Sequence, residues 1–396
     1  MLGRIRSRVI CGTPGLRAVS QPERRQRIAV LGLRGIPEVQ GGVERHCQHL
    51  YPRLARSGHG ITILGRKPYI ASEPYAFEGV KIIPLWSPRK KSLEAIAHTT
   101  LALLWICLHR KEFDLIHIHA IGPALLTPLA RLTGLKVVVT NHGPDYDRQK
   151  WGGFAKWVLR TGEMLGAHFA HRMITVSQTI RDLMRDKHGI TAEYIPNGVV
   201  LPDRIPAGPV LEKFGLTKGR YVVAVGRLVP EKGFHDLMEA FSRLDCDWKL
   251  ALVGDADHED AYSLELKAKA KNTPGVVMTG FQKGAALGEL YSNAGLFVLP
   301  SYHEGLPIVG LEAMSYELPM ILSDIPANRE IAEPQELFPV GDVEALVAKI
   351  KSFLDTPELL SSEETLTRKR QRLDQEFNWD RIAEQTAQVY RCSAGL

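Results

Sequence analysis

Short apolar runs alternate with helical patterns along almost the whole chain, and this alternation is interrupted only once. From residue 27 onward the apolar runs are continuous and often β-branched, as is typical of strands that are buried on both faces. The interruption is the Gly- and Pro-rich segment 197–217. The pattern therefore predicts an α/β protein with two doubly wound, Rossmann-like domains, each a parallel sheet with helices on both sides.

The interruption also sets the expected boundaries. A chain of 396 residues is too long for one ordinary core. We expect a basic, disordered tail over 1–27, an N-terminal domain over 28–200, a linker over 201–217 and a second domain over 218–375. The predicted strands are 27–33, 61–64, 81–84, 115–119, 136–141, 173–176, 193–195, 221–226, 250–254, 276–279, 296–300, 320–323 and 337–339. Ligand loops at the strand ends would face a cleft between the domains.

The charge is divided unevenly between the two halves. The net charge of +6 arises from a tail with seven arginines and one glutamate, a +9 first half over 28–200 and a −9 second half over 201–396. The basic first half favours contact with anionic lipid headgroups or an anionic acceptor; an unselected surface imbalance is the alternative. We expect no nucleic-acid partner.

The most apolar run is Leu93–Leu108, which includes Glu94 and His98. It is shorter than the roughly 18 uncharged residues that a membrane span needs. The prediction is a buried helix. A helix lying on a membrane surface, behind Arg89 and the two lysines that follow it, is the alternative.

The five cysteines are scattered, without a CxxC pair. This favours a reducing, cytoplasmic compartment over a disulfide framework. We expect neither a metal site nor a cofactor.

The loop that contains Glu304 and Glu312 carries the most chemical information. An apolar strand, 296–300, runs into a Gly/Pro loop and then into a helix. Such a turn points backbone N–H groups and a helix N-terminus at one place, which favours an anion. One carboxylate precedes that place and the other lies about two helical turns beyond it. A nucleotide sugar, with a diphosphate between two hydroxyl-rich groups, has the matching layout.

Two further strand-to-helix loops complete the pattern. Gly41 and Gly42 follow the first strand and would let the backbone approach a ligand closely. Arg227 and Lys232 follow the first strand of the second domain and could converge on a diphosphate. Taken singly, the glycine pair could be an ordinary tight turn, and the cations could be solvated side chains.

Taken together, the loops resemble those of the GT-B glycosyltransferases of family four, which are retaining, nucleotide-sugar-dependent enzymes. The resemblance covers about residues 28–391. It is carried by Gly41-Gly42, Asp114–His119, Val176-Ser177, Ile195–Val199, Gly226–Leu228, Glu231–Gly233, Thr279–Phe281, Glu304–Pro307, Glu312 and Asn378-Trp379. It implies a sugar transfer from a nucleotide diphosphate sugar to a hydroxyl of a glycan or of a lipid-linked acceptor. It also implies that residues 376–396 form a helix that crosses back to the N-terminal domain.

The resemblance implies a role for each charged residue. Arg227 and Lys232 would bind the donor diphosphate, Glu312 the ribose hydroxyls, and Glu304 the donor sugar near the reacting centre. The remaining donor contacts, largely with the backbone, would come from Gly41, Gly42, Phe281, Gly305, Leu306 and Ile308.

A histidine at a strand end completes the predicted site. His142 follows 136–141 and resembles the family's histidine beside the donor sugar and acceptor. The acceptor-side candidates after it are Asp145, Asp147 and Arg148. His117 and His119 share one face of their strand, and we expect them to serve in packing.

With Glu312 assigned to ribose, no second carboxylate remains at the sugar to act as a nucleophile in the manner of a retaining glycosidase. A same-face displacement is therefore expected, in which the departing diphosphate takes the acceptor's proton while Arg227 and Lys232 stabilise its charge. Two alternatives stay open: a nucleotide-sugar epimerase of the same fold, and a non-catalytic sugar- or lipid-binding protein.

Overall fold

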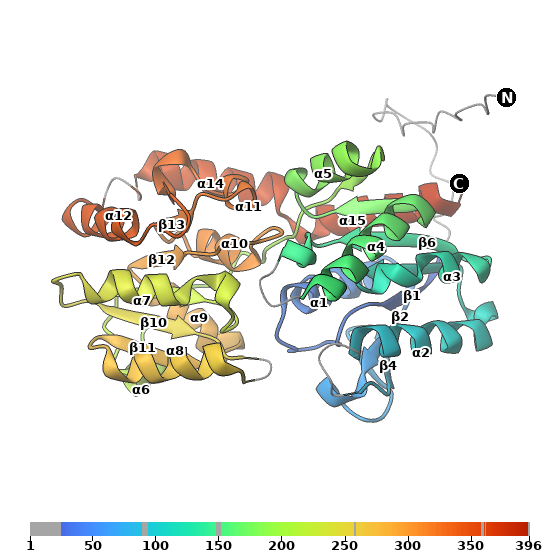
Figure 1. The fold of residues 1–396 in the computed structure, drawn as a ribbon, viewed down its shortest axis with the longest axis horizontal. Coiled ribbons are helices and arrows are strands. Elements are labelled where there is room, and N and C mark those ends of the chain that lie inside the picture. The colour runs from blue at the N-terminus through green and yellow to red at the C-terminus, as the bar shows by residue number, and fades with distance from the viewer. Residues whose placement is uncertain are drawn as a thin grey trace.

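The computed structural model describes residues 25–88, 94–147, 152–256, 259–357, 360 and 362–394. The predicted fold class is confirmed: the chain forms two mainly parallel sheets, each covered by helices on both faces (Figure 1). Most of the predicted tail lies outside the described residues, and Arg27 already belongs to the first strand.

The first sheet has eight strands in the order β3-β4-β2-β1-β5-β6-β7-β8. They are β1 Arg27–Leu31, β2 Gly60–Arg66, β3 Tyr75–Phe77, β4 Val80–Leu85, β5 Leu115–His119, β6 Lys136–Asn141, β7 Arg172–Thr175 and β8 Glu193–Tyr194. β3 is antiparallel to β4, across a turn at Glu78-Gly79 where both residues have positive φ. The sequence analysis missed β3, because three residues at a sheet edge give almost no periodic signal.

Helices cover both faces of this sheet. They are α1 Gly42–Arg56, α2 Glu94–Leu108, α3 Thr127–Leu132, α4 Gly153–Phe169 and α5 Gln178–His188. Successive strand side chains point to opposite faces. Ile28 and Val30 accordingly pack against α1, whereas Ala29 and Leu31 belong to the cluster that includes residues of α2 and α4.

The second sheet has six parallel strands in the order β11-β10-β9-β12-β13-β14. They are β9 Tyr221–Val225, β10 Lys249–Val253, β11 Val276–Gly280, β12 Leu296–Leu299, β13 Met320–Ser323 and β14 Leu337–Phe338. The helices that follow the first sheet are α6 Pro209–Phe214, α7 Phe234–Ser242, α8 Ala261–Asn272, α9 Gly284–Asn293, α10 Ile308–Ser315, α11 Pro326–Arg329, α12 Val343–Asp355, α14 Glu363–Glu376 and α15 Trp379–Ala394.

Short 3₁₀ turns occur in several of the connections. They are η1 Lys67–Tyr69, η2 Arg110–Glu112, η3 Pro123–Leu126, η4 Asp145–Asp147, η5 Pro230–Lys232 and η6 Pro334–Glu336.

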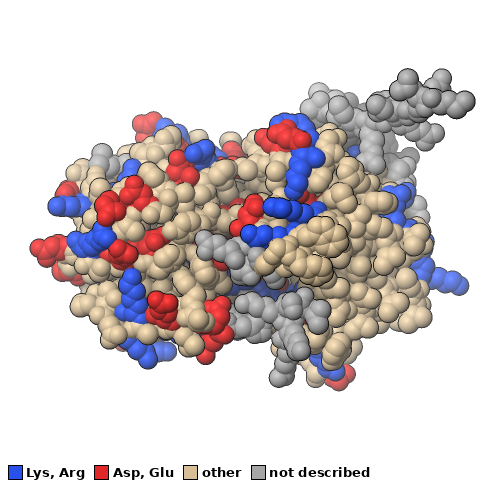
Figure 2. Space-filling view, in the orientation of Figure 1, with Lys and Arg blue, Asp and Glu red and all other residues tan. Residues whose placement is uncertain are grey.

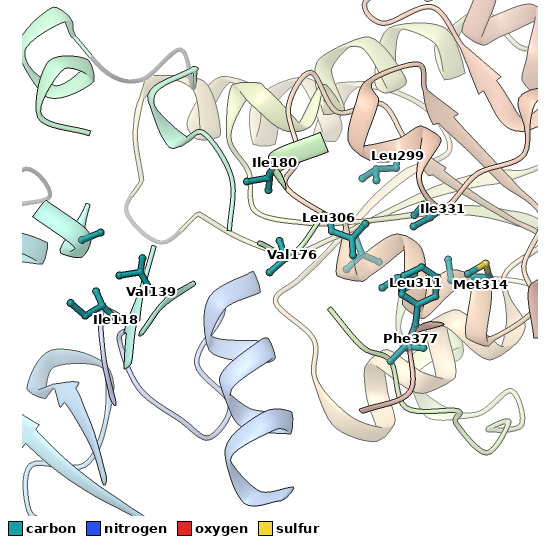
Figure 3. Close-up of a cluster of buried hydrophobic side chains, with 14 of the residues drawn as sticks. Ile118, Val139, Val176, Ile180, Leu299, Leu306, Leu311, Met314, Ile331 and Phe377 are labelled. Atoms are coloured by element: carbon teal, nitrogen blue, oxygen red, sulfur yellow. The ribbon is translucent and has the colours of Figure 1, made fainter. Parts of the chain in front are cut away.

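One apolar cluster joins the two domains. It runs from Ile118 and Val139 in the first sheet, through Val176, to Leu306 and Leu311 in the second domain (Figure 3). The halves therefore share buried surface and do not meet only at a linker.

The chain passes between the domains twice, and the two passages pair with each other. The Val199 N–H donates to the Phe377 carbonyl at 2.9 Å. α15 then packs on α1 and β6 of the first domain, with Trp379 and Tyr390 in its core. Gly198 makes this approach possible, because a Cβ there would lie 2.6 Å from the Trp379 ring.

The prediction that the Leu93–Leu108 helix is buried is wrong for one of its sides. α2 buries Ala102 and Ile106 but exposes Leu104 and Leu108. Its apolar residues surround the helix, whereas the sheet covers only one side of it. Within the described residues, no helix combines the length and apolarity needed to span a bilayer.

Candidate active site

The carboxyl ends of both sheets open into one cleft of about 450 Å³, lined by residues of both domains. The predicted acceptor-side residue Asp145 lines this cleft. So do all the other predicted site residues on the catalytic and donor side, namely Gly41, Gly42, His142, Arg227, Lys232, Phe281, Glu304, Gly305, Leu306, Ile308 and Glu312. Asp147 is exposed in η4 and is not among the cleft-lining residues, and Arg148 lies outside the described residues. The structure thus brings the three loops together, while the role of each residue stays a prediction.

A partly buried ion pair forms the centre of the second-domain wall. The Lys232 Nζ lies 2.6 Å from Glu304 Oε1, and the Ser301 hydroxyl donates to the same oxygen at 2.7 Å. Burial alone would raise the pKa of the Glu304 carboxyl, but the Lys232 ammonium and these hydrogen bonds hold that pKa below its usual value. Glu304 is therefore a fixed anion beside a fixed cation.

Glu312 receives hydrogen bonds from both domains. Arg45 of α1 reaches Oε1, with Nη2 at 2.8 Å and Nε at 3.1 Å. The Tyr291 hydroxyl donates to Oε2 at 3.3 Å. The carboxylate lies on α10 and faces the first domain, so α1 and α10 are tied together at the edge of the cleft.

The glycine loop of the first domain is braced from within. The Arg34 Nε lies 3.2 Å from Glu44 Oε1, the Arg34 backbone N–H donates to the same oxygen at 3.0 Å, and Arg34 Nη2 donates to the Gln40 carbonyl at 2.7 Å. A Cβ on Gly42 would meet nothing within 4 Å. The loop therefore holds a rigid, open surface at the start of α1, where an N-terminal helix end favours an anion.

The two walls touch backbone to backbone at Gly305. A Cβ there would lie 1.9 Å from the His142 carbonyl oxygen, and one on Gly143 would lie 3.3 Å from the Gly305 Cα. Only glycine at position 305 permits this approach.

Asn197 links the walls through its side chain. Its Nδ2 donates to the Leu306 carbonyl at 3.1 Å. Its Oδ1 is therefore the acceptor for His46 Nδ1, at 3.0 Å, which places the His46 proton on Nδ1. Burial lowers the pKa of His46 to about 4, so the ring stays neutral.

His142 ends a hydrogen-bonded chain that runs through the first-domain core. His142 Nε2 lies 2.9 Å from His119 Nδ1, and His119 Nε2 lies 2.5 Å from the Tyr51 hydroxyl. That hydroxyl lies 3.0 Å from His117 Nδ1. The chain orients His142 through His119 and His117, which the sequence analysis assigned to packing, and through Tyr51, which it did not single out.

The far end of the chain is held by two more hydroxyls. The Tyr390 hydroxyl of α15 lies 2.7 Å from His117 Nδ1, and the Thr140 hydroxyl lies 2.7 Å from His117 Nε2. Burial lowers the pKa of His117 to about 3 and places the pKa values of His119 and His142 well below their usual range. The network is therefore neutral, in contrast to the Lys232–Glu304 pair.

His46, His119 and His142 form the one group of potential metal ligands found among the described residues, with ligand atoms within 4.8 Å of one another. His46 Nδ1 already bonds to Asn197, and His119 Nδ1 and His142 Nε2 bond to each other. These hydrogen bonds would compete with a cation for the same nitrogens.

The sequence analysis missed the residues whose side chains hydrogen-bond to a different helix, strand or loop. They are Arg45, His46, Asn197 in its bridging role, Tyr51 and Tyr390. Arg45 and His46 directly follow the glycine loop, and this position on α1 was the only available signal. Nothing local points to Tyr51 or Tyr390, because their partners lie far away in the sequence.

Two family models together match most of the chain. Residues 40–201 match a model described as Glycosyltransferase Family 4, and residues 211–371 match one described as Glycosyl transferases group 1.

Relatives extend these matches. The chain is 30% identical to an alpha-maltose-1-phosphate synthase of Mycobacterium tuberculosis, over 92% of this chain and 99% of that protein. It is 28% identical to a UDP-Gal:alpha-D-GlcNAc-diphosphoundecaprenol alpha-1,3-galactosyltransferase of Escherichia coli, over 65% of this chain and 70% of that protein.

Solved structures share the fold. A sucrose-phosphate synthase from Thermosynechococcus elongatus superposes with a TM-score of 0.79 at 24% identity, over 93% of this chain and 98% of the other. The Anabaena protein HepE in complex with UDP-glucose does so with a TM-score of 0.76 at 18% identity, over 93% and 100%.

Proposed function

The chain belongs to family four of the GT-B glycosyltransferases, and on that premise we propose that it transfers a sugar from a nucleotide diphosphate sugar, with retention at the anomeric carbon. A glycosyltransferase activity in glycan synthesis is what its relatives share. The nucleotide-sugar donor is supported by the UDP-glucose bound to HepE, whose fold matches over almost the whole chain.

The Lys232–Glu304 pair is the observation that carries this proposal. Its two charges lie at the second-domain wall, opposite the open backbone of Gly42. A donor with its diphosphate at Lys232 and Arg227 would place its sugar near Glu304 and its ribose toward Glu312. Fixed cations at the leaving diphosphate lower the barrier because they need no reorganisation as charge develops.

Retention without a covalent intermediate fits the geometry of Glu304. Its Oε1 already accepts from Lys232 and Ser301, so this carboxylate is held as an anion and is not an unengaged nucleophile. In the proposed step, the bond from the anomeric carbon to the diphosphate oxygen breaks while the bond to the acceptor oxygen forms on the same face. The acceptor's proton goes to the departing diphosphate oxygen. No metal is required, because Arg227 and Lys232 supply the positive charge.

His142 would face the sugar from the first-domain wall as a neutral ring. Its partner His119 and the chain behind it fix the orientation of that ring. A neutral donor or acceptor beside the sugar can position hydroxyls without adding charge.

The proposed acceptor is a hydroxyl of a glycan or of a lipid-linked sugar, reached from the Asp145 side of the cleft. The undecaprenol-linked substrate in the name of the E. coli relative supports the lipid-linked class. We place the protein in the cytoplasm, at an anionic membrane surface. Cys47, Cys107 and Cys246 of the described part are free thiols, which suits a reducing compartment.

Turnover with a panel of UDP, GDP and ADP sugars tests this function. A thermal-shift screen of the nucleotides identifies the best ligand, because preferential binding to the folded state raises the melting temperature. The product of that donor and a hydroxyl acceptor should keep the anomeric configuration of the donor in its NMR spectrum. An inverted product would refute the same-face step.

The same incubations separate the two rival functions. With donor alone, an epimerase would form a new nucleotide sugar, whereas a transferase gives at most slow hydrolysis. A binding protein would show a thermal shift without any turnover.

A further inference from the structure

Three helices on the outside of the first domain expose large apolar side chains. The exposed fractions are 57% for Leu104 and 84% for Leu108 on α2, 82% for Leu132 on α3, and 79% for Phe154 and 61% for Trp157 on α4. α3 packs against α4, and both α2 and α4 contact η3. Figure 2 shows a broad, largely tan area on this side of the domain, where Figure 1 places the three helices. We call the exposed side of α2, α3 and α4 the outer apolar face.

The pattern on α2 shows that this face is not adapted to water. Between Ala95 and Leu108 there is no Asp, Glu, Lys or Arg. The exposed positions Leu101, Leu104 and Leu108 recur at helical spacing, opposite the side that packs on the sheet. A surface helix normally carries polar residues at such positions. A contiguous apolar area of this kind marks an interaction surface.

Only positive charge accompanies the apolar side chains on these helices. Their two acidic residues, Glu94 and Glu163, are both buried, whereas Arg131 and Arg160 are exposed. Exposed Trp, Phe and Leu beside arginines, with no exposed carboxylate on the same helices, suit the interfacial region of an anionic bilayer.

A second copy of the chain would fit this face poorly. In a two-fold pairing the same patch meets itself. Arg131 and Arg160 would then face like charges, and none of the three helices offers an exposed carboxylate to pair with them. The charge therefore favours an anionic partner surface over self-association.

We propose that the outer apolar face docks on the surface of an anionic lipid bilayer. α4 packs against η4, whose Asp145 lines the cleft. Phe154 and Trp157 lie in the first turns of α4, so docking would hold the cleft near the headgroups. The benefit of this placement rests on the proposed lipid-linked acceptor; the binding to lipid does not.

Vesicle flotation of the full chain, without donor or acceptor, tests the proposal. The wild type should float with phosphatidylcholine vesicles that contain phosphatidylglycerol and not with phosphatidylcholine alone, and salt should weaken the binding. The double variant Arg131→Gln/Arg160→Gln should bind about 25-fold more weakly, about fivefold for each cation removed from the surface. Trp157→Glu should weaken binding by about tenfold or more, because it replaces an interfacial aromatic residue with a charge that the lipid repels.

Matched variants on the second domain serve as controls. Leu264 on α8 is 53% exposed, and Lys269 and Lys271 of the same helix are also exposed. Leu264→Glu and Lys269→Gln/Lys271→Gln should leave flotation unchanged. Donor hydrolysis should be equal in the wild type and in Trp157→Glu, because Trp157 does not line the cleft.

Three results would overturn the proposal: no flotation of the wild type, equal flotation with neutral and anionic vesicles, or control variants that weaken binding as much as those on the outer face. A dimer that Trp157→Glu dissociates, without vesicle binding, would assign the face to a second copy instead. Normal flotation without any turnover would refute only the proposed function.

Discussion

The two walls of the cleft are built from opposite kinds of polar contact. The second-domain wall holds a partly buried charge pair, Lys232 with Glu304, supplied by two loops that each follow a strand. The first-domain wall holds a neutral chain of rings and hydroxyls that ends at His142. A charged wall suits the site where a diphosphate gains charge, and a neutral wall suits a site that only positions hydroxyls.

The largest expected effect comes from removing the cation of the charged wall. Lys232→Ala should lower kcat by about 10³-fold, because the leaving diphosphate loses a preorganised positive charge. Initial rates at saturating donor measure this loss. Lys267→Ala is the control: Lys267 pairs with Asp255 and Glu259 and does not line the cleft. A kcat for Lys232→Ala within tenfold of the wild type would remove the main support for the site.

The second prediction forces the two walls apart. Gly305→Ala would place a Cβ 1.9 Å from the His142 carbonyl oxygen, and neither backbone can yield without shifting a loop. We expect kcat/KM to fall by about 10²-fold, the cost of misplacing reacting groups by about 1 Å.

Gly60→Ala is the matched control for this substitution. A Cβ at Gly60 in β2 would meet its nearest atom at 3.5 Å, an ordinary contact. If both variants keep full activity, the close approach of the walls at Gly305 has no part in catalysis.

The same contrast explains what the sequence could predict. Arg227, Lys232 and Glu304 lie in strand-to-helix connections, and Glu312 lies on the helix that follows one, so all four belong to a recognisable local pattern. The alternating apolar runs are also a local pattern, and they predicted the strands of both sheets apart from the three-residue strand β3.

The neutral wall was not predictable, because its contacts have no local pattern. Tyr51 lies on α1 and Tyr390 on α15, and the fold brings both to His117 on β5. His117 and His119 alternate on a buried strand, and this pattern is equally typical of residues that only pack in a core. The outward side of α2 was missed for a related reason: an apolar run cannot reveal whether a second element covers it.

The third prediction tests whether the buried histidines of the first-domain wall are uncharged in the folded protein. The folded-state pKa values of His46 and His117 are lowered to about 4 and about 3, whereas an unfolded histidine titrates near 6.5. Between pH 6.5 and 5 the unfolded state therefore binds more protons than the folded state. The contribution of each neutral histidine to the free energy of unfolding is complete above pH 6.5. It falls by about 1.4 kcal/mol per pH unit as the pH drops through this window.

Urea unfolding at pH 7, 6 and 5 measures this slope. In His117→Gln the loss of stability per pH unit should be smaller than in the wild type by about one proton's contribution. An unchanged slope would mean that His117 is protonated in the folded chain, and that the first-domain wall carries charge.

The smallest expected effect is at the contact that joins the two walls. The Arg45 side chain is 41% exposed where it meets Glu312, so the pair contributes less than about 1 kcal/mol. If Arg45 helps to hold the walls around a bound nucleotide, Arg45→Ala should weaken UDP binding by about threefold in a calorimetric titration. Arg53→Ala removes a pair with Asp380 from the same helix without touching the cleft, and it should leave the affinity unchanged. Tighter UDP binding by Arg45→Ala would instead show that Arg45 and the ribose compete for the Glu312 carboxylate, so that the charged wall is partly blocked until the first domain withdraws.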